Sequence, residues 1–331
     1  MSDIKKLPLG SVTGSIRLSA TASATSLFMA RTGPTTRTTS PFFHYATVLT
    51  AYSLDGTPST SIAPVTVPLL LPQMPAWDAA EGADGQYELA MSIFGGGWNE
   101  LVVNGVNGGK VTPSYAYTVE DSTFPRFVRS TGSSVDAQYV AAILSGGELA
   151  IIAPQPPEPD GTVTVKILTL VKKAALGVVF GDLSHGLPKS FNLLYQVNRT
   201  TGPNNRDGTF AGALWLATFD FSTDRLGTPV ALLADMAFAG FDVAVNAGTY
   251  CVLAVTGDGA PLLAAFDSSG NPVGQPFLPV GAWNNTDHSI TSPTIVAAPT
   301  PAHAFTFAFV DTVNATPDAI YWGTYTAIAS P

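Results

Sequence analysis

Aspartates and histidines occur together in the segments that separate the apolar runs of this sequence. Asp182 precedes His185 by three residues, and Asp287 is directly followed by His288. A carboxylate beside an imidazole can transfer protons or bind a polar ligand. The four histidines and the single cysteine have none of the paired spacings that fix a metal ion, so we predict neither a metal site nor a cofactor.

Tryptophans accompany two of these segments. Trp77 lies directly before Asp78, and Trp283 lies four residues before Asp287. An indole face can stack on the C–H groups of a sugar ring while carboxylates accept hydrogen bonds from its hydroxyls. The predicted ligand-contact residues are Trp77, Asp121, Asp182, His185, Trp283, Asp287 and His288.

The elements that must position these side chains are short β-strands. Helical periodicity is nearly absent, and the β-branched and aromatic runs end at Gly, Pro, Asn or Asp. One apolar strand recurs six times, at residues 24–30, 85–91, 137–143, 189–195, 248–254 and 302–308. A second strand and a Gly- or Asn-containing turn follow in most repeats, for example at Asp55-Gly56 and Ser269-Gly270-Asn271. Repeats of this length predict a propeller or a solenoid.

We therefore predict an all-β fold, a six-bladed β-propeller of three- to four-stranded antiparallel blades over residues 1–331. The expected blades are 14–72, 73–122, 123–178, 179–236, 237–281 and 282–331. The last repeat has room for only three strands, so residues 5–13 are expected to supply its fourth strand and close the ring.

An aspartate recurs between repeats, just before each expected innermost strand, in five of six cases. Short Asp side chains bond nearby backbone N–H groups in turns, which gives a structural interpretation. The functional interpretation is a set of carboxylates at one mouth of a central channel. The sequence leaves both open for Asp78, Asp121, Asp182, Asp235 and Asp287.

The strand pattern and period resemble those of six-bladed propeller proteins, which include sugar-binding lectins and several enzymes. The resemblance covers the whole chain and lies in no specific motif. Fucose-binding lectins of this shape carry an Arg, a Glu and a Trp in each repeated site. Here the five tryptophans stand at different places within their repeats, and no Arg or Glu recurs in step.

Composition excludes several classes of protein and partner. With 46% hydrophobic and only 12% charged residues the chain is not of the disordered class. A net charge of −9 without a basic run argues against nucleic acid and anionic membranes as partners. We find no signal peptide and no transmembrane segment, and expect a cytoplasmic or leaderless secreted protein. Cys251 lies in an apolar run and is expected to be buried.

Three functions remain for such a chain. The first hypothesis is a non-catalytic module that recognises a glycan or small-molecule ligand in the manner of a lectin. The second is a hydrolase, lyase or cyclase with one active site at the channel mouth, using Asp182/His185 or Asp287/His288. The third is a structural subunit of a larger assembly, and the oligomeric state stays open.

Overall fold

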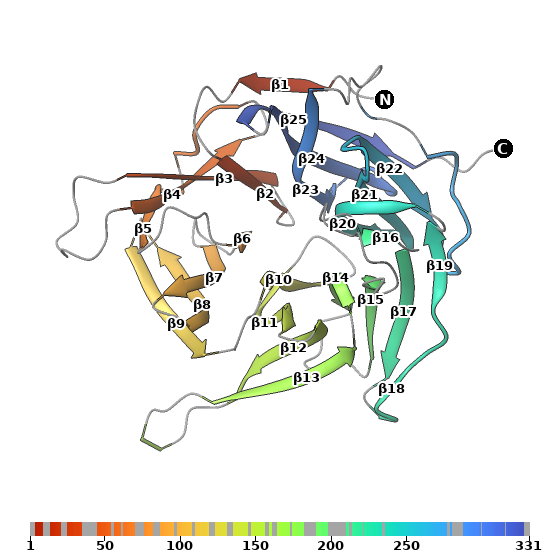
Figure 1. Cartoon of the computed structure of the whole chain (residues 1–331), viewed down its shortest axis with the longest axis horizontal. Coiled ribbons are helices and arrows are strands. Elements are labelled where there is room, and N and C mark those ends of the chain that lie inside the picture. Colours follow the sequence, from red (N-terminus) through yellow and green to blue (C-terminus); the bar gives the residue numbers. More distant parts are fainter. Residues whose placement is uncertain are drawn as a thin grey trace.

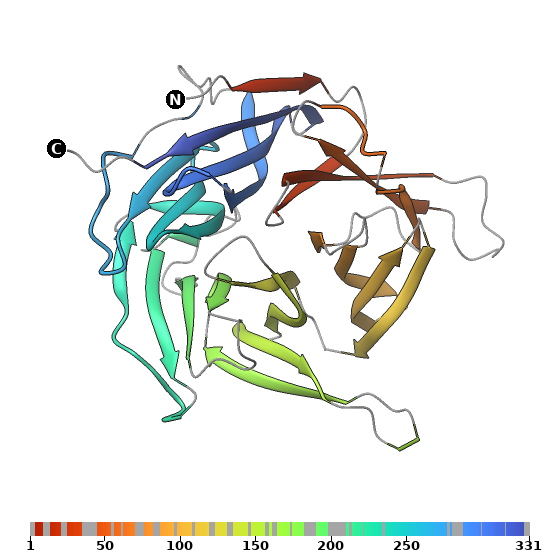
Figure 2. The ribbon, with the colours of Figure 1, turned by 180° about the vertical axis from the view of Figure 1, so that it is seen from behind.

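The structure is a computed structural model and consists of β-strands arranged in a ring (Figures 1 and 2). No helix occurs in the part of the chain that it describes. The described residues are 4–8, 14–20, 25–34, 45–53, 56–60, 62–69, 76–81, 87–95, 98–107, 110–118, 123–130, 135–144, 147–155, 159–160, 164–172, 174–181, 190–197, 210–211, 214–220, 222–233, 236–276, 279, 287–298, 300–314 and 316–327.

Each of the first three blades consists of four consecutive antiparallel strands. Blade 1 contains β2 (Gly14–Ala20), β3 (Thr25–Pro34), β4 (Tyr45–Ser53) and β5 (Val65–Leu69). Blade 2 contains β6 (Ala76–Glu81), β7 (Tyr87–Gly95), β8 (Trp98–Asn107) and β9 (Lys110–Thr118). Blade 3 contains β10 (Thr123–Ser130), β11 (Val135–Leu144), β12 (Glu148–Pro154) and β13 (Val165–Val171).

The other three blades depart slightly from this plan. Blade 4 contains β14 (Ala174–Gly181), β15 (Ser190–Val197) and β17 (Leu214–Asp220), with β18 (Arg225–Leu226) and β19 (Val230–Leu233) both paired to β17. Blade 5 contains β20 (Ala237–Asn246), β21 (Thr249–Thr256) and β22 (Pro261–Phe266), with β16 (Phe210–Ala211) on the free edge of β20. Blade 6 contains β23 (His288–Ala297), β24 (Ala304–Val313), β25 (Thr316–Thr326) and β1 (Lys5–Pro8).

Hydrogen bonding joins these six blades into five sheets. The innermost strands β10 and β14 pair in parallel over two positions, Arg129 with Phe180 and Ser130 with Gly181. Blades 3 and 4 therefore share one nine-stranded sheet. The inner strand β14 begins at Ala174, a few residues before the 178/179 boundary that the repeats suggest. The six-bladed propeller predicted from the repeats is the observed fold.

The ring is closed by the strand that lies first in the chain. Strand β1 pairs antiparallel with β25, in the register Lys5 with Trp322 through Pro8 with Ala319, and completes the sheet of blade 6. The two strands lie side by side at the rim in both views (Figures 1 and 2). This pairing covers the edge of β25, as the sequence predicts.

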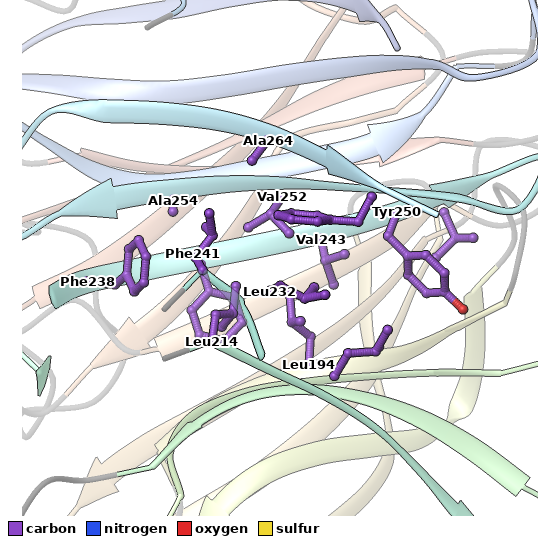
Figure 3. Packing of buried hydrophobic residues seen from close by; sticks show 14 residues of the cluster. Leu194, Leu214, Leu232, Phe238, Phe241, Val243, Tyr250, Val252, Ala254 and Ala264 are labelled. Atoms are coloured by element: carbon purple, nitrogen blue, oxygen red, sulfur yellow. The ribbon is translucent and has the colours of Figure 1, made fainter. Parts of the chain in front are cut away.

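Each of the six blade interfaces contains a buried apolar cluster. The cluster between blades 4 and 5, drawn in Figure 3, brings Leu194, Leu214 and Leu232 of blade 4 against Phe238 and Val252 of blade 5. Five further clusters fill the interfaces 3/4, 1/2, 5/6, 6/1 and 2/3 in the same way. Burial of apolar side chains around the full ring is therefore what holds the blades together.

The recurring apolar strand is the second strand of every blade, namely β3, β7, β11, β15, β21 and β24. This strand packs against both neighbouring blades and is therefore apolar on both faces. In β24 all residues but the last are buried. The predicted turns occur in blades 1 and 5, where Gly56 and Gly270 adopt φ of 87° and 84° and isolated bridges join Tyr52 to Pro58 and Phe266 to Pro272.

Candidate functional site at the junction of blades 5 and 6

The predicted pair Asp287 and His288 lies where the chain enters the innermost strand of blade 6. His288 is the first residue of β23, and Asp287 precedes it as an exposed turn residue. The backbone N–H of Asn314, in the β24–β25 hairpin, donates to the carbonyl oxygen of Asp287 at 3.0 Å. The connection into β23 and this hairpin therefore share one face of the ring.

The carboxylate that engages His288 belongs to Asp311 of β24 rather than to the adjacent Asp287. Nδ1 of His288 lies 3.0 Å from both carboxylate oxygens of Asp311. The Asp311 side chain is 1% exposed, whereas that of His288 is 33% exposed. The arrangement therefore presents an imidazole at the surface above a buried carboxylate.

Neighbouring residues hold this pair in place from two blades. Thr312 donates its hydroxyl to the carbonyl oxygen of Ser289 at 2.8 Å, within the β23–β24 pair. From blade 5, the carbonyl oxygen of Gly259 accepts the N–H of Ile290 at 3.0 Å. Gly259 has φ +83°, and a Cβ there would lie 3.0 Å from the Cβ of Ser289, so only glycine lets the blade 5 hairpin approach this closely.

Trp77 lies elsewhere and is inaccessible. It belongs to β6, is 2% exposed and packs in the cluster between blades 1 and 2 with Phe28 and Tyr87. The expectation that its ring stacks on a ligand does not fit this burial. The physical reason is that alternate residues of an inner strand point into the interface between blades, and the indole fills that space.

Asp78 supports the structural interpretation of the recurring aspartates. It lies within β6 rather than before it, and its Oδ2 accepts the backbone N–H of Phe127 from β10 of blade 3 at 2.9 Å. Its Oδ1 lies 4.0 Å from Arg17 Nε of blade 1 and 3.7 Å from Arg126 Nη1 of blade 3. One buried carboxylate thus links the inner strands of three consecutive blades.

The aspartate that repeats this contact is one that the sequence analysis missed. Asp242 of β20 is fully buried, and its Oδ2 accepts the backbone N–H of Ile295 from β23 at 2.9 Å. Asp78 pairs with Ala90 and Asp242 with Leu253, each the sixth residue of the recurring apolar strand. In the sequence Asp78 stands seven residues before its recurring strand and Asp242 six residues before its own, so only the strand register reveals that the two positions are equivalent.

The remaining predicted residues cannot be placed. Asp121, Asp182, His185, Asp235 and Trp283 lie outside the described residues. Within the part of the chain that the structure describes, no three His, Cys, Asp or Glu side chains gather as metal ligands. Cys251 is buried as expected, and burial raises the pKa of its thiol. The described residues include no helix that could span a membrane.

Comparison with known proteins assigns the fold. No family model and no curated protein matches the chain. Among solved structures, the fucose-specific lectin from Aleuria aurantia is similar over 99% of both chains, with a TM-score of 0.54 and 12% identity. Another structure of an Aleuria aurantia lectin is described as a six-bladed β-propeller. The chain shares this propeller fold.

Two further solved structures are similar to this chain. AofleA from Arthrobotrys oligospora matches with a TM-score of 0.55 and 10% identity, over 98% of this chain and 87% of its own. The Trypanosoma rangeli sialidase matches with a TM-score of 0.51 and 9% identity, over 96% of this chain and 59% of its own. The TM-scores show a shared fold, and at identities this low the similarity shows the fold alone, because function depends on the sites built on it.

Proposed function

We propose that the protein is a carbohydrate-binding propeller that recognises a glycan in the manner of a lectin. The observation that carries this proposal is the end-to-end similarity to a fucose-specific lectin of the same fold. The net charge of −9 repels a polyanionic ligand, so the chain is better suited to a neutral, hydroxyl-rich one.

We place the glycan contact on the face that carries the connections between blades. Asp287 and His288 represent that face among the described residues, and Asp121, Asp182, His185 and Trp283 stay part of the proposed site. The supporting geometry is a partly exposed imidazole fixed by a buried carboxylate on two rigid strands. Rigid strands beneath a site reduce the entropy lost when a ligand binds.

A glycan array tests the proposal, followed by calorimetric titration of the best neutral glycan. We expect binding to a limited set of neutral glycans and a weaker response from the Asp287→Asn variant. Asp267→Asn is the matched control, because Asp267 is a partly exposed aspartate in a turn of blade 5 that binds its own neighbours. An array without binding to any glycan would contradict the proposal. Equal binding by both variants and the parent protein would contradict the proposed location of the site.

A glycoside hydrolase is the second candidate, and the His288–Asp311 pair is the observation that favours it. An imidazole held by a carboxylate is a common proton-transfer group in enzymes. Chromogenic glycosides distinguish the two functions, since a hydrolase releases the chromophore at a rate that falls in a His288→Asn variant. Binding without turnover leaves the lectin function in place.

A further inference from the structure

The outer edge of blade 3 differs from the outer edges of the other five blades. Strand β13 lies at the rim of the ring and ends its sheet, with no strand beyond it in the described part of the chain (Figures 1 and 2). The outermost strand or bridge of every other blade contains or directly follows a proline, namely Pro8, Pro68, Pro113, Pro229 and Pro272. A proline lacks a backbone donor and so protects an exposed edge from pairing. The seven residues of β13 include none.

The hydrogen-bond ladder shows which residues of β13 point away from the sheet. The backbone N–H of Gln155 donates to the carbonyl oxygen of Thr164 at 2.9 Å, in the same register as the β12–β13 pair. In an antiparallel pair every second residue bonds its partner strand, so the even-numbered residues of β13 face β12. The backbone N–H and C=O groups of the odd-numbered residues Val165, Ile167 and Thr169 therefore point outward.

The centre of this outward row is apolar and exposed. Ile167 is 44% exposed, more than Val48 and Val230, the other exposed large hydrophobic residues in the described part of the chain. Its outward neighbours Val165 and Thr169 are half-buried and, like Ile167, β-branched. An edge with outward backbone groups and β-branched side chains is a template for a further strand.

We infer that β13 pairs with β13 of a second copy of this chain, antiparallel and about a twofold axis at Ile167, so that the protein forms a dimer. Outward-pointing residues must meet outward-pointing residues for the backbone groups to bond. This register sets Ile167 opposite its own copy, and Val165 of one chain opposite Thr169 of the other. The two most exposed apolar side chains then cover each other. The inference is independent of the proposed glycan recognition.

The charges along the edge favour this arrangement. Lys166 stands opposite Leu168 of the other copy, whereas a twofold axis at Lys166 would set two like charges against each other. Asp160 is exposed before β13, and Lys172 is exposed after it. Antiparallel pairing brings the acidic end of one strand toward the basic end of the other, while parallel pairing would bring like charges together.

The size of the contact sets the expected affinity. A twofold pair occupies the edge of β13 in both copies, so assembly stops at the dimer. A single strand pair buries less surface than a standard interface, so we expect a dissociation constant in the micromolar range. Sedimentation equilibrium between about 1 and about 100 µM brackets such a constant and should show a monomer–dimer equilibrium.

Replacing Ile167 with proline tests the edge, because it supplies the residue that the other outer edges have. The N–H of Ile167 points away from β12, so Ile167→Pro removes the outward donor and keeps the ladder within blade 3. We expect the dimer dissociation constant to rise at least about 10-fold. Val48→Thr is the matched control, since Val48 is 39% exposed but lies in β4, which is paired on both sides. It should leave the dimer unchanged.

A cysteine at position 167 tests the register. Cys251 is the single cysteine of the chain and is fully buried, so an introduced surface thiol reacts alone. In the proposed register the two copies of position 167 have Cα atoms about 5.5 Å apart, within the reach of a disulfide. Mild oxidation of Ile167→Cys should give a covalent dimer on a non-reducing gel. Val165→Cys should not, because its two thiols are offset along the strands.

Several outcomes would overturn the inference. A parent protein that stays monomeric leaves the edge to a different protein, and a dimer unaffected by Ile167→Pro places the second copy on another surface. Assemblies larger than a dimer exclude the closed twofold pair. Circular dichroism establishes that each variant is folded. If Ile167→Pro does not fold, Ile167→Lys replaces it, because it keeps the backbone donor and sets two like charges against each other.

Discussion

The Oδ2 atom of Asp78 lies 2.9 Å from the backbone nitrogen of Phe127, across the interface between blades 2 and 3. Asp242 makes the same contact to Ile295 across the interface between blades 5 and 6, also at 2.9 Å. Each carboxylate satisfies a backbone N–H on the innermost strand of the following blade. At these two interfaces a specific polar contact between inner strands therefore joins the blades in addition to their apolar cores.

Replacing Asp78 by alanine should destabilise the fold by about 2–4 kcal/mol, because it leaves the buried Phe127 N–H without its acceptor and the buried Arg126 guanidinium without this counter-charge. Denaturant unfolding monitored by fluorescence measures the loss. Asp220→Ala is the control, since Asp220 is a partly exposed aspartate at the end of β17 that binds its own turn at Ser222 and Thr223. Equal stability of the two variants would contradict the structural role of Asp78.

Deletion of residues 1–13 removes β1 and exposes the edge of β25 and part of the cluster between blades 6 and 1. We expect the thermal midpoint to fall by on the order of 10 °C, measured by calorimetry. Lys6→Ala separates backbone pairing from side-chain contacts, because it keeps the strand and removes an exposed 3.4 Å ion pair with Asp318, worth about 0–1 kcal/mol, and the contact of the ammonium group with Tyr321. A truncated chain as stable as the parent would show that β1 is dispensable for closure.

Gly177 of β14 faces Leu149 of β12 across the interface between blades 3 and 4. A Cβ at Gly177 would lie 2.5 Å from Cδ2 of Leu149, so Gly177→Ala should cost about 1–3 kcal/mol of stability. Leu149→Ala is itself destabilising, since this side chain is fully buried. The double variant should be less destabilised than the two single effects added together, which a double-mutant cycle measures. Simple additivity would mean that the two residues do not touch.

Asp267 should titrate below its ordinary range. The side-chain hydrogen bond from Asn271 is the main cause that lowers the pKa of this carboxyl from 3.8, with backbone N–H groups of the same turn adding to it. A depressed pKa in the folded state means that the turn is stabilised above the unfolded pKa and loses that stabilisation as the pH falls through the folded value. NMR titration should find the Asp267 pKa higher in Asn271→Ala than in the parent protein. An unchanged pKa would exclude the Asn271 side chain as the cause.

The period of the fold was predictable because one strand per blade is buried on both faces. Such a strand reads as a continuous apolar run, as in β21, where every residue but the last is buried, and it identifies the blade even when turns vary. The closing strand was predictable by elimination, since the last repeat has only three strands and residues before the first repeat had no partner. Both inferences depend on patterns within a repeat.

The polar contacts were less predictable because their partners belong to other strands or other blades. Sequence adjacency pointed to Asp287 as the partner of His288, but the antiparallel register brings Asp311 to it from the neighbouring strand. Asp242 gave no sign of its role, because the N–H that it accepts comes from Ile295 in the next blade. Trp77 reads as a ligand-stacking residue in isolation, and only the packing of blade 1 against blade 2 identifies it as core.

The pairing of β1 with β25 also constrains the order in which the blades can fold during synthesis. Strand β1 is made before β25, and every other described strand lies between them in the chain, so blade 6 stays incomplete until β25 has been synthesised. The apolar interfaces among the first five blades can form during translation, while β1 stays unpaired and must not aggregate. Its sequence suits this delay, because Lys5 and Lys6 keep it charged and Pro8 removes one backbone donor from the exposed edge.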